Sequence, residues 1–238
     1  LDILEIRRME GEKMKIISVK ESVFSQNDRV ADETRAKLKE QGTFLINVMS
    51  SPGSGKTTLL SALINALKDR LKIVAMDVDI ETDVDARRLH DNTGVVSVQV
   101  HNGGLCHIDA DMVKESLSQA DFPKSDLIIL ENIGNLVCPA EFDTGAHLNM
   151  MLLSVPEGDD KPLKYPLMFE KCDLVAVTKI DTLEAFDFDM TKFNERVKSL
   201  NPNAQIYPVS AKTGEGLETL ANKVYNIIKV FKGENENG

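Results

Sequence analysis

Short apolar runs alternate with longer stretches of mixed polarity along most of the chain. The first run, TFLINVM at 43–49, has too little polar alternation for a strand with one face in water, and it is typical of a strand buried on both faces. Similar runs recur, mostly separated by helix-compatible segments, at 71–77, 95–100, 126–132, 148–155, 173–179 and 204–210. This alternation predicts an α/β fold with a doubly wound, mainly parallel sheet.

The segment before the first strand is expected to form a lead-in helix. The stretch 25–42 has helix-forming composition, with apolar Val30 and Leu38 widely spaced and with Gly42 as the expected C-cap. We expect an N-terminal extension at residues 1–24, a single domain that contains this helix at 25–232, and a disordered tail at 233–238.

The charge balance narrows the class of partner. A formal net charge of −10 and a pI near 5.0 exclude a protein that coats nucleic acid or an anionic membrane, because a phosphate polymer demands a broad basic face. No apolar run approaches the roughly 20 residues of a membrane span, and the charged start is unlike a secretory signal. We therefore expect a cytoplasmic protein whose three cysteines are reduced, with no nucleic-acid or membrane partner.

A phosphate-binding loop is predicted between the first strand and the helix after it, as in P-loop NTPases. SSPGSGKTT at 50–58 matches the pattern G-x-x-x-x-G-K-[ST], except that Ser50 takes the position of the first glycine. Backbone N–H groups and the helix N-terminus would surround a β-phosphate, Lys56 would neutralise β- and γ-phosphate oxygens, and the Thr57 hydroxyl would bind Mg²⁺. A glycine-rich turn that only caps a helix gives no reason for this lysine. The predicted nucleotide contacts here are Gly53, Ser54, Gly55, Lys56, Thr57 and Thr58.

Two further strand ends carry the residues expected of a nucleotide switch. The acidic stretch MDVDIETDVD at 76–85 supplies Asp79 as the preferred Mg²⁺ ligand. ENIG at 131–134 resembles the D-x-x-G switch, in which Glu131 would hold a Mg²⁺-bound water and Gly134 would donate its N–H to the γ-phosphate. Asn135 stands where many fast GTPases have a water-orienting glutamine, so its shorter amide predicts slow hydrolysis. The predicted catalytic residues are Lys56, Asp79, Glu131, Gly134 and Asn135. The other acidic side chains, interpreted as solvated charge or as the start of the next helix, are Asp77, Glu81, Asp83 and Asp85.

The base side of the site favours guanine. TKID at 178–181 resembles N-K-x-D, whose aspartate accepts two hydrogen bonds from N1 and N2 of guanine, and adenine lacks that donor pair. Asp181 would therefore discriminate GTP from ATP, with Lys179 along the base plane. Thr178 replaces the usual asparagine. The SAK stretch, which resembles the last base-side loop and would bring a backbone N–H to the guanine O6, is Ser210, Ala211 and Lys212.

One cysteine–histidine pair suggests a second kind of site. Cys106 and His107 are adjacent, and the preceding HNGG stretch supplies the backbone bend that two neighbouring side chains need in order to share an ion. Cys138 lies four residues after Gly134, on or next to the predicted switch. Two thiolates and an imidazole suit Zn²⁺ or Ni²⁺, with a fourth position for water or a second copy of the chain. Spacing alone favours structural cysteines and a solvent-exposed histidine, and Cys172 is interpreted as a core residue.

Taken together, the motifs closely resemble the nickel-incorporation GTPases of [NiFe]-hydrogenase maturation, the HypB family. The resemblance covers about 43–220 and is most specific in GLCHIDADMV and ENIGNLVCPAEFDTG. It implies a GTP-dependent homodimer with a metal site at the subunit interface, formed by the residues that match Cys106, His107 and Cys138. It also implies a nickel-binding accessory protein as partner and the hydrogenase large subunit as the receiver. Members with an N-terminal cysteine motif or His-rich stretch store nickel, and neither feature is found here.

Three other functions are consistent with parts of the sequence. A urease-accessory GTPase has histidine after Cys-Pro, whereas Ala140 follows Cys138 and Pro139 here. An ATP-dependent kinase or synthetase could use the same phosphate loop, although Asp181 argues against adenine. A regulatory GTPase with purely structural thiols would hold no nickel or zinc.

Overall fold

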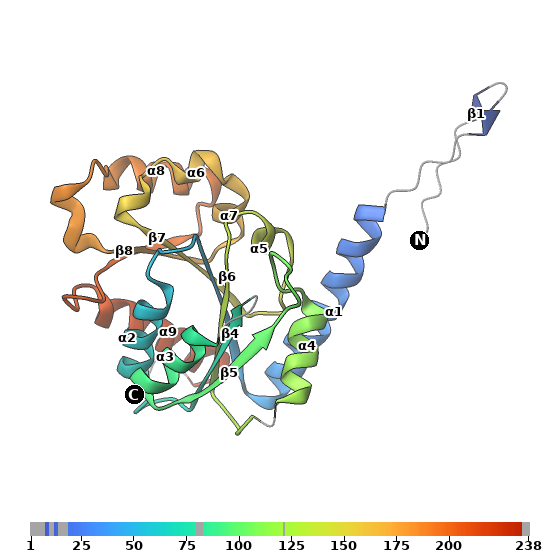
Figure 1. The fold of residues 1–238 in the computed structure, drawn as a ribbon, viewed down its shortest axis with the longest axis horizontal. Coiled ribbons are helices and arrows are strands. Elements are labelled where there is room, and N and C mark those ends of the chain that lie inside the picture. Colours follow the sequence, from blue (N-terminus) through green and yellow to red (C-terminus); the bar gives the residue numbers. More distant parts are fainter. Residues whose placement is uncertain (1–7, 10–11, 14–18, 80–82, 121, 235–238) are drawn as a thin grey trace.

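A sheet of seven parallel strands forms the centre of the molecule in the computed structural model, which describes residues 8–9, 12–13, 19–79, 83–120 and 122–234 (Figure 1). The strand order is β5-β4-β6-β3-β7-β8-β9. The doubly wound α/β prediction is confirmed, and every described pairing in this sheet is parallel. The strands are β3 (Phe44–Ser50), β4 (Ile73–Asp79), β5 (Val96–His101), β6 (Leu127–Gly134), β7 (Leu148–Ser154), β8 (Leu174–Thr178) and β9 (Gln205–Val209).

Helices cover both faces of the sheet, which explains why the central strands are mostly apolar. On one face, Leu60, Leu89 and Val224 pack into a single core cluster with β3 and β6. They come from α2 (Lys56–Leu67), α3 (Val84–Thr93) and α9 (Leu217–Phe231). The other face is covered by α1 (Val19–Gln41) and α4 (Ala110–Gln119), and by α7 (Pro166–Lys171) and α8 (Met190–Leu200). The shorter elements are β1 (Arg8–Met9), β2 (Glu12–Lys13), α5 (Cys138–Glu141), α6 (Lys161–Lys164) and the 3-10 helices η1 (Val155–Glu157) and η2 (Ile180–Ala185).

The predicted lead-in helix is present and begins six residues earlier than expected, at Val19 rather than residue 25. It lies along α4 (Figure 1), and its Val30 and Leu38 are buried, as the apolar spacing indicated. Gly42 follows it with φ +71°. We propose that 25–232 form one domain, because all of the sheet and its covering helices fall within that range except the start of α1, which begins at Val19. Most of the predicted tail, 235–238, lies outside the described residues.

Parallel strands bring every predicted motif to one edge of the sheet. The phosphate loop follows β3, the acidic stretch follows β4, the ENIG segment ends β6, and the two base-side segments follow β8 and β9. The carboxyl ends of parallel strands are where α/β proteins bind ligands. Within the described part of the chain, no helix is long and apolar enough to cross a membrane.

Candidate functional site

The phosphate loop owes its shape to glycines and to one buried serine. Gly53 and Gly55 have φ +75° and +91°, a backbone conformation that other residues adopt only with strain. Ser50 is fully buried and replaces the first glycine of the motif without losing the loop: its hydroxyl accepts from the Ser54 hydroxyl at 2.7 Å and donates to the Ser51 carbonyl at 2.8 Å. Ser50 therefore holds the loop's first turn, and its role could not be read from the motif.

Lys56 opens α2 directly after this loop, with Thr57 and Thr58 in the first turn. The Thr57 hydroxyl donates to Oε1 of Glu131 at 2.9 Å. These two predicted Mg²⁺ ligands, 74 residues apart, are therefore in direct contact. Thr58 is exposed, on the outer side of the turn.

A small acidic cavity lies beside this pair. Its volume is about 280 Å³, and Lys56, Asp79 and Gly134 help to line it. Asp77 and Glu131 are 4% and 3% exposed, and each has one carboxylate oxygen, Oδ2 and Oε2, that is buried without a hydrogen-bond partner. Buried oxygens with no partner fit a hard cation such as Mg²⁺, which prefers oxygen ligands. The chain therefore presents a donor set for Mg²⁺ next to the phosphate loop.

Burial changes the acidity of both carboxyl groups. It raises the pKa of Asp77 to about 7, and the charges of Asp85 and Asp79 add to the effect. Burial and the neighbouring Asp77 raise the pKa of Glu131 to about 8, whereas Lys56 acts in the opposite direction. A divalent cation offsets this cost, because it favours the ionised form of both groups.

The interpretation of Asp77 as solvated charge is wrong. The odd-numbered acidic residues of the stretch look alike in sequence, but Asp77 is an interior residue of β4, so its side chain is covered by the neighbouring strands. Asp79, the preferred ligand, is half-buried at the end of the strand and lines the same cavity. Asp83 and Asp85 pair with arginines in the first turns of α3, as expected of a helix start. Glu81 lies outside the described residues.

The base side is joined to the phosphate loop by hydrogen bonds. Thr178, at the usual asparagine position, donates its hydroxyl to the Ser54 carbonyl at 2.7 Å, and the Lys179 ammonium donates to the Gly53 carbonyl at 2.8 Å. Lys179 has φ +59°, which a non-glycine residue rarely adopts. Here the two bonds stabilise that conformation.

Asp181 is held in place by the last base-side loop. Its Oδ1 accepts from the Ser210 hydroxyl at 2.6 Å, and the Lys212 ammonium lies 3.9 Å from Oδ2. Ser210 is fully buried, and Ala211, which follows it in the sequence, is partly buried. The two motifs that were expected to meet guanine are thus in contact with each other.

The two cysteines of the second site come together. Sγ of Cys106 lies 2.8 Å from Sγ of Cys138, and the two are free thiols. Cys106 stands in the Cys–His loop, residues 102–109, which bends at Gly103 and Gly104 as the sequence predicted. Cys138 opens α5 at the end of the switch segment, residues 131–138. A pair of thiols therefore links the loop after β5 to the segment after β6.

His107 is near the sulfur pair but does not complete a ligand set. Its Nδ1 is 3.8 Å from Sγ of Cys106, and its ring stacks on Phe142 with centroids 3.8 Å apart. Burial lowers the pKa of His107, which keeps the imidazole neutral, as a metal ligand must be. Among the described residues, no three His, Cys, Asp or Glu side chains are grouped so that they could hold a metal ion. The predicted set of three ligands is thus not assembled within one chain.

Cys172 is a core residue, as expected. It is fully buried in the cluster that contains Phe169 and Phe193, and its thiol donates to the Phe169 carbonyl at 3.3 Å. Burial raises the pKa of this thiol to about 12, so it does not supply a thiolate.

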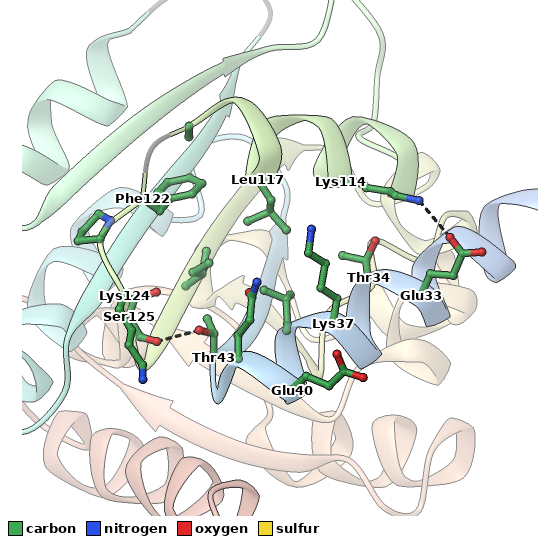
Figure 2. Close-up of a pocket in the computed structure, with 15 residues that line it drawn as sticks. Glu33, Thr34, Lys37, Glu40, Thr43, Lys114, Leu117, Phe122, Lys124 and Ser125 are labelled. Carbon is green, nitrogen blue, oxygen red and sulfur yellow. Dashed lines mark hydrogen bonds and ion pairs between the residues drawn. The ribbon is translucent and has the colours of Figure 1, made fainter.

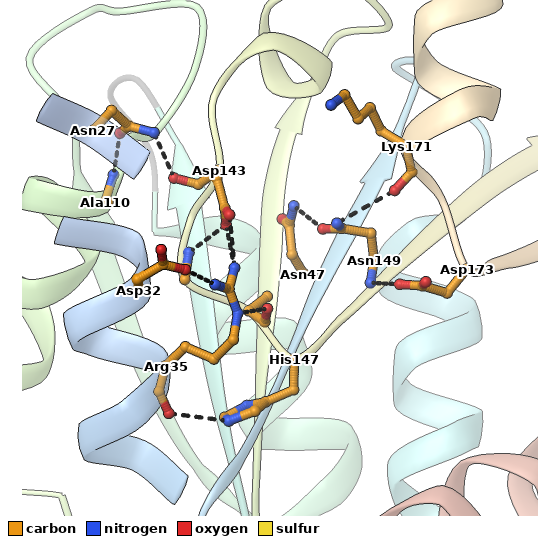
Figure 3. Close-up of polar contacts among 12 residues, drawn as sticks. Asn27, Asp32, Arg35, Asn47, Ala110, Asp143, His147, Asn149, Lys171 and Asp173 are labelled. Carbon is orange, nitrogen blue, oxygen red and sulfur yellow. Dashed lines mark hydrogen bonds and ion pairs between the residues drawn. The ribbon is translucent and has the colours of Figure 1, made fainter. Parts of the chain in front are cut away.

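Helix α1 supports both halves of the sulfur site. The buried Asn27 accepts from the Ala110 N–H at 2.9 Å and donates to the Asp143 carbonyl at 3.0 Å (Figure 3). Ala110 begins α4 directly after the Cys–His loop, and Asp143 follows α5. Arg35 adds two bonds to the Asp143 carboxylate, at 2.6 and 2.8 Å (Figure 3). These contacts could not be predicted from the sequence, since Asn27 and Arg35 look like ordinary polar positions of a helix.

A hollow larger than the acidic cavity lies elsewhere in the described part of the chain. It has a volume of about 710 Å³ and lies between α1, α4 and the start of β6 (Figure 2). Thr43 and Ser125, which precede β3 and β6, line it, so it opens at the amino ends of the strands. None of the predicted site residues lines this hollow, and they gather instead at the opposite edge of the sheet.

Comparison with known proteins agrees with this geometry. The family described as "CobW/HypB/UreG, nucleotide-binding domain" matches residues 44–208. The chain is 42% identical over 225 residues to the hydrogenase/urease maturation factor HypB of Helicobacter hepaticus, covering 93% of this chain and 90% of the relative. It is 38% identical to the hydrogenase maturation factor HypB of Escherichia coli K12, covering 87% of this chain and 71% of the relative.

Two solved structures have the same fold. HypB from Helicobacter pylori in complex with nickel superposes with a TM-score of 0.80 at 39% identity, over 90% of this chain and 99% of the other. The hydrogenase maturation factor HypB from Archaeoglobus fulgidus superposes with a TM-score of 0.79 at 35% identity, over 86% of this chain and 99% of the other.

Proposed function

The chain belongs to the CobW/HypB/UreG family and within it to the HypB hydrogenase maturation factors, and from this premise we propose that it binds GTP, hydrolyses it slowly and inserts nickel into the [NiFe]-hydrogenase large subunit. One observation carries the proposal. The sulfur pair of Cys106 and Cys138 lies at the same sheet edge as the nucleotide motifs, and Cys138 is four residues from the switch glycine Gly134. Nucleotide and nickel would therefore share one segment of chain.

The residues around the phosphates would act by position and charge. Lys56 neutralises β- and γ-phosphate oxygens, the glycine-rich loop and α2 N-terminus surround the β-phosphate, and Gly134 donates its N–H to the γ-phosphate. Thr57, Asp79 and Glu131 would hold Mg²⁺, which supplies charge neutralisation at the phosphates when bound. Turnover would be slow because Asn135 is shorter than a glutamine and its amide is engaged with the Cys106 carbonyl. A water-orienting role for Asn135 remains a prediction.

Guanine would be selected by Asp181, whose carboxylate accepts from N1 and N2 of the base. The Ser210 hydroxyl orients this carboxylate, the Lys179 stem lies along the base, and the Ala211 N–H meets O6. Adenine lacks the N–H groups at N1 and N2, so the Asp181 carboxylate would be left without partners and ATP should bind poorly.

The nickel site would use the thiolates of Cys106 and Cys138 together with His107. Two thiolates balance the charge of Ni²⁺ or Zn²⁺, and either ion accepts soft sulfur ligands. Because one chain does not group three ligands, we propose that a second copy completes the site, so that the functional form is a GTP-dependent homodimer. A nickel-binding accessory protein would load it.

Metal and nucleotide titrations test the proposal. Cys106→Ala and Cys138→Ala should each lower Ni²⁺ affinity at least about tenfold, since each removes one of two thiolate ligands. Cys172→Ala is the matched control and should leave the Ni²⁺ affinity unchanged, because Cys172 is a buried core thiol.

In parallel, competition against labelled GDP should show that GTP binds about a hundredfold or more tighter than ATP, and Asp181→Asn should remove that preference. Unaltered nickel binding in both site variants would refute the Cys106–Cys138 nickel site, and equal GTP and ATP affinity would refute the selection of guanine by Asp181.

A further inference from the structure

One side chain connects the nucleotide switch to the sulfur pair. The Nδ2 of Asn135 donates to the Cys106 carbonyl at 3.2 Å, across 29 residues of sequence. Its Oδ1 accepts from the Val137 N–H at 2.9 Å. The amide thus uses its donor for the Cys–His loop and its acceptor for the turn that leads into Cys138.

The residue before Asn135 is packed directly against the phosphate loop. A Cβ at Gly134 would lie 3.0 Å from the backbone nitrogen of Pro52 and 3.1 Å from its Cα and Cγ, so even a methyl side chain would crowd the phosphate loop. Gly134 also pairs with Ser50 at the end of β3, beyond a register irregularity between β3 and β6. A γ-phosphate contact that shifts Gly134 must therefore also shift its neighbour Asn135.

The Cys–His loop and the chain that follows Cys138 are each fixed by hydrogen bonds that do not involve Asn135. The buried Asn102 donates through Nδ2 to the carbonyls of Leu105 and His107, at 2.6 and 2.9 Å, which sets the shape of the Cys–His loop. Asn27 of α1 holds the start of α4 and Asp143, the second residue after α5 (Figure 3). Between these anchors, the part of the switch segment that can respond to Gly134 is 135–137.

We propose that Asn135 is the positioning residue through which a γ-phosphate at Gly134 changes the geometry of the Cys106–Cys138 pair. The proposal rests on the GTP and nickel functions proposed above. When Gly134 turns its N–H toward the γ-phosphate, the hydrogen bond from the Asn135 amide to the Cys106 carbonyl breaks. The Cys–His loop and Cys138 are then no longer held together by this bond, so the distance between the two sulfurs can change. Nickel affinity then depends on the nucleotide through one hydrogen bond, and metal binding must affect nucleotide affinity by the same factor.

An almost isosteric substitution isolates this bond. Asn135→Asp keeps the acceptor for the Val137 N–H and replaces the donor to the Cys106 carbonyl with a carboxylate oxygen. Asn135→Ala removes both bonds without adding charge and serves as the second variant. Asn65→Asp is the matched control, because Asn65 also donates its amide to a backbone carbonyl, that of Asn92, at 3.1 Å on the exposed surface of α2.

The measurement is Ni²⁺ affinity by chelator competition on the full chain, once with GDP and once with a non-hydrolysable GTP analogue. We expect the two affinities to differ by about tenfold or more in the wild type and in Asn65→Asp. In Asn135→Asp and Asn135→Ala the ratio should fall to within about twofold of unity. The nickel–thiolate charge-transfer absorption should change with nucleotide in the wild type and stay constant in both Asn135 variants. Because the readout is a ratio, an altered nickel affinity common to both states does not affect it.

A ratio in the Asn135 variants that equals the wild-type ratio would overturn the inference while leaving the proposed function intact. A wild-type ratio of unity would also overturn it, since Asn135 would then have nothing to transmit. Failure of the proposed function is recognised separately in the same titrations, as absent nickel binding or absent preference for guanine nucleotide.

Discussion

Asp77 and Glu131 place two carboxyl groups in the interior, and this has a consequence for stability. Their ordinary pKa values are 3.8 and 4.5, and in the fold they are raised to about 7 and about 8. Between the ordinary and the raised values, the folded protein binds protons that the unfolded chain has released. The free energy of unfolding therefore decreases as pH rises through this window, by about 1.4 kcal/mol per pH unit for each such group.

We predict that melting in EDTA shows this loss and that Asp77→Asn reduces it. The melting temperature of the wild type should fall between pH 6 and pH 8, and the fall should be shallower in Asp77→Asn, which has one titrating group fewer. Mg²⁺ with GDP should restore stability at pH 8 in the wild type, because the cation favours the ionised carboxylates. Asp91→Asn, at an exposed position of α3, is the control. If the melting temperature falls equally steeply with pH in wild type and in Asp77→Asn, Asp77 does not titrate in this range.

At the scale of elements, α1 is more than a cover for the sheet. Asn27 and Arg35 connect it to the start of α4 and to the segment after α5, so it braces both sulfur-bearing segments (Figure 3). Phe24, one turn before Asn27, adds an aromatic contact to Phe142, whose other neighbour is the His107 ring. The orientation of His107 thus depends on a helix that is far away in sequence.

We predict that Asn27→Ala destabilises the protein and loosens the sulfur site together. It leaves the Ala110 N–H and the Asp143 carbonyl without their partner, which should cost about 1–3 kcal/mol. For a chain of this size the melting temperature should fall by roughly 2–4 °C per kcal/mol. Amide hydrogen exchange should rise at Ala110 and around Asp143. Asn222→Ala on α9, whose side chain accepts an exposed bond from Arg70, should change neither quantity by much. Loss of stability without faster exchange at these sites would contradict the bracing role.

The elements were predictable from sequence, whereas the connections between them were not. Period and apolar content identify a buried strand, so β3 and its neighbours were found within one or two residues. The motif positions follow from the parallel sheet. The burial of Asp77, the bond from Asn135 to Cys106 and the bracing by Asn27 depend instead on residues that meet only after folding. A one-dimensional pattern distinguishes neither Asp77 from Asp79 nor a surface asparagine from a buried one.

At the scale of the whole molecule, the sulfur pair lies in an apolar and exposed setting. Leu105 and Val137, each next to one of the cysteines in sequence, are 43% and 52% exposed. Exposed apolar side chains beside an incomplete ligand set are what a contact with a second copy would cover. Their burial in such a contact contributes about 25 cal/mol for each Å² removed from water.

We therefore predict that Val137→Asp prevents dimer formation. In wild type, Ni²⁺ together with a GTP analogue should shift the mass measured by light scattering from the 26.4 kDa of one chain to twice that value. Val137→Asp places a charge in the proposed contact and should remain monomeric, with nickel affinity reduced because the second copy no longer completes the site. Val230→Asp is the matched control, since Val230 is 61% exposed on α9 beside Phe231, which packs on the first residue of β3 at the opposite sheet edge. A dimer of unchanged affinity in Val137→Asp would show that the copies meet through another face, and the third nickel ligand would then have to come from the same chain.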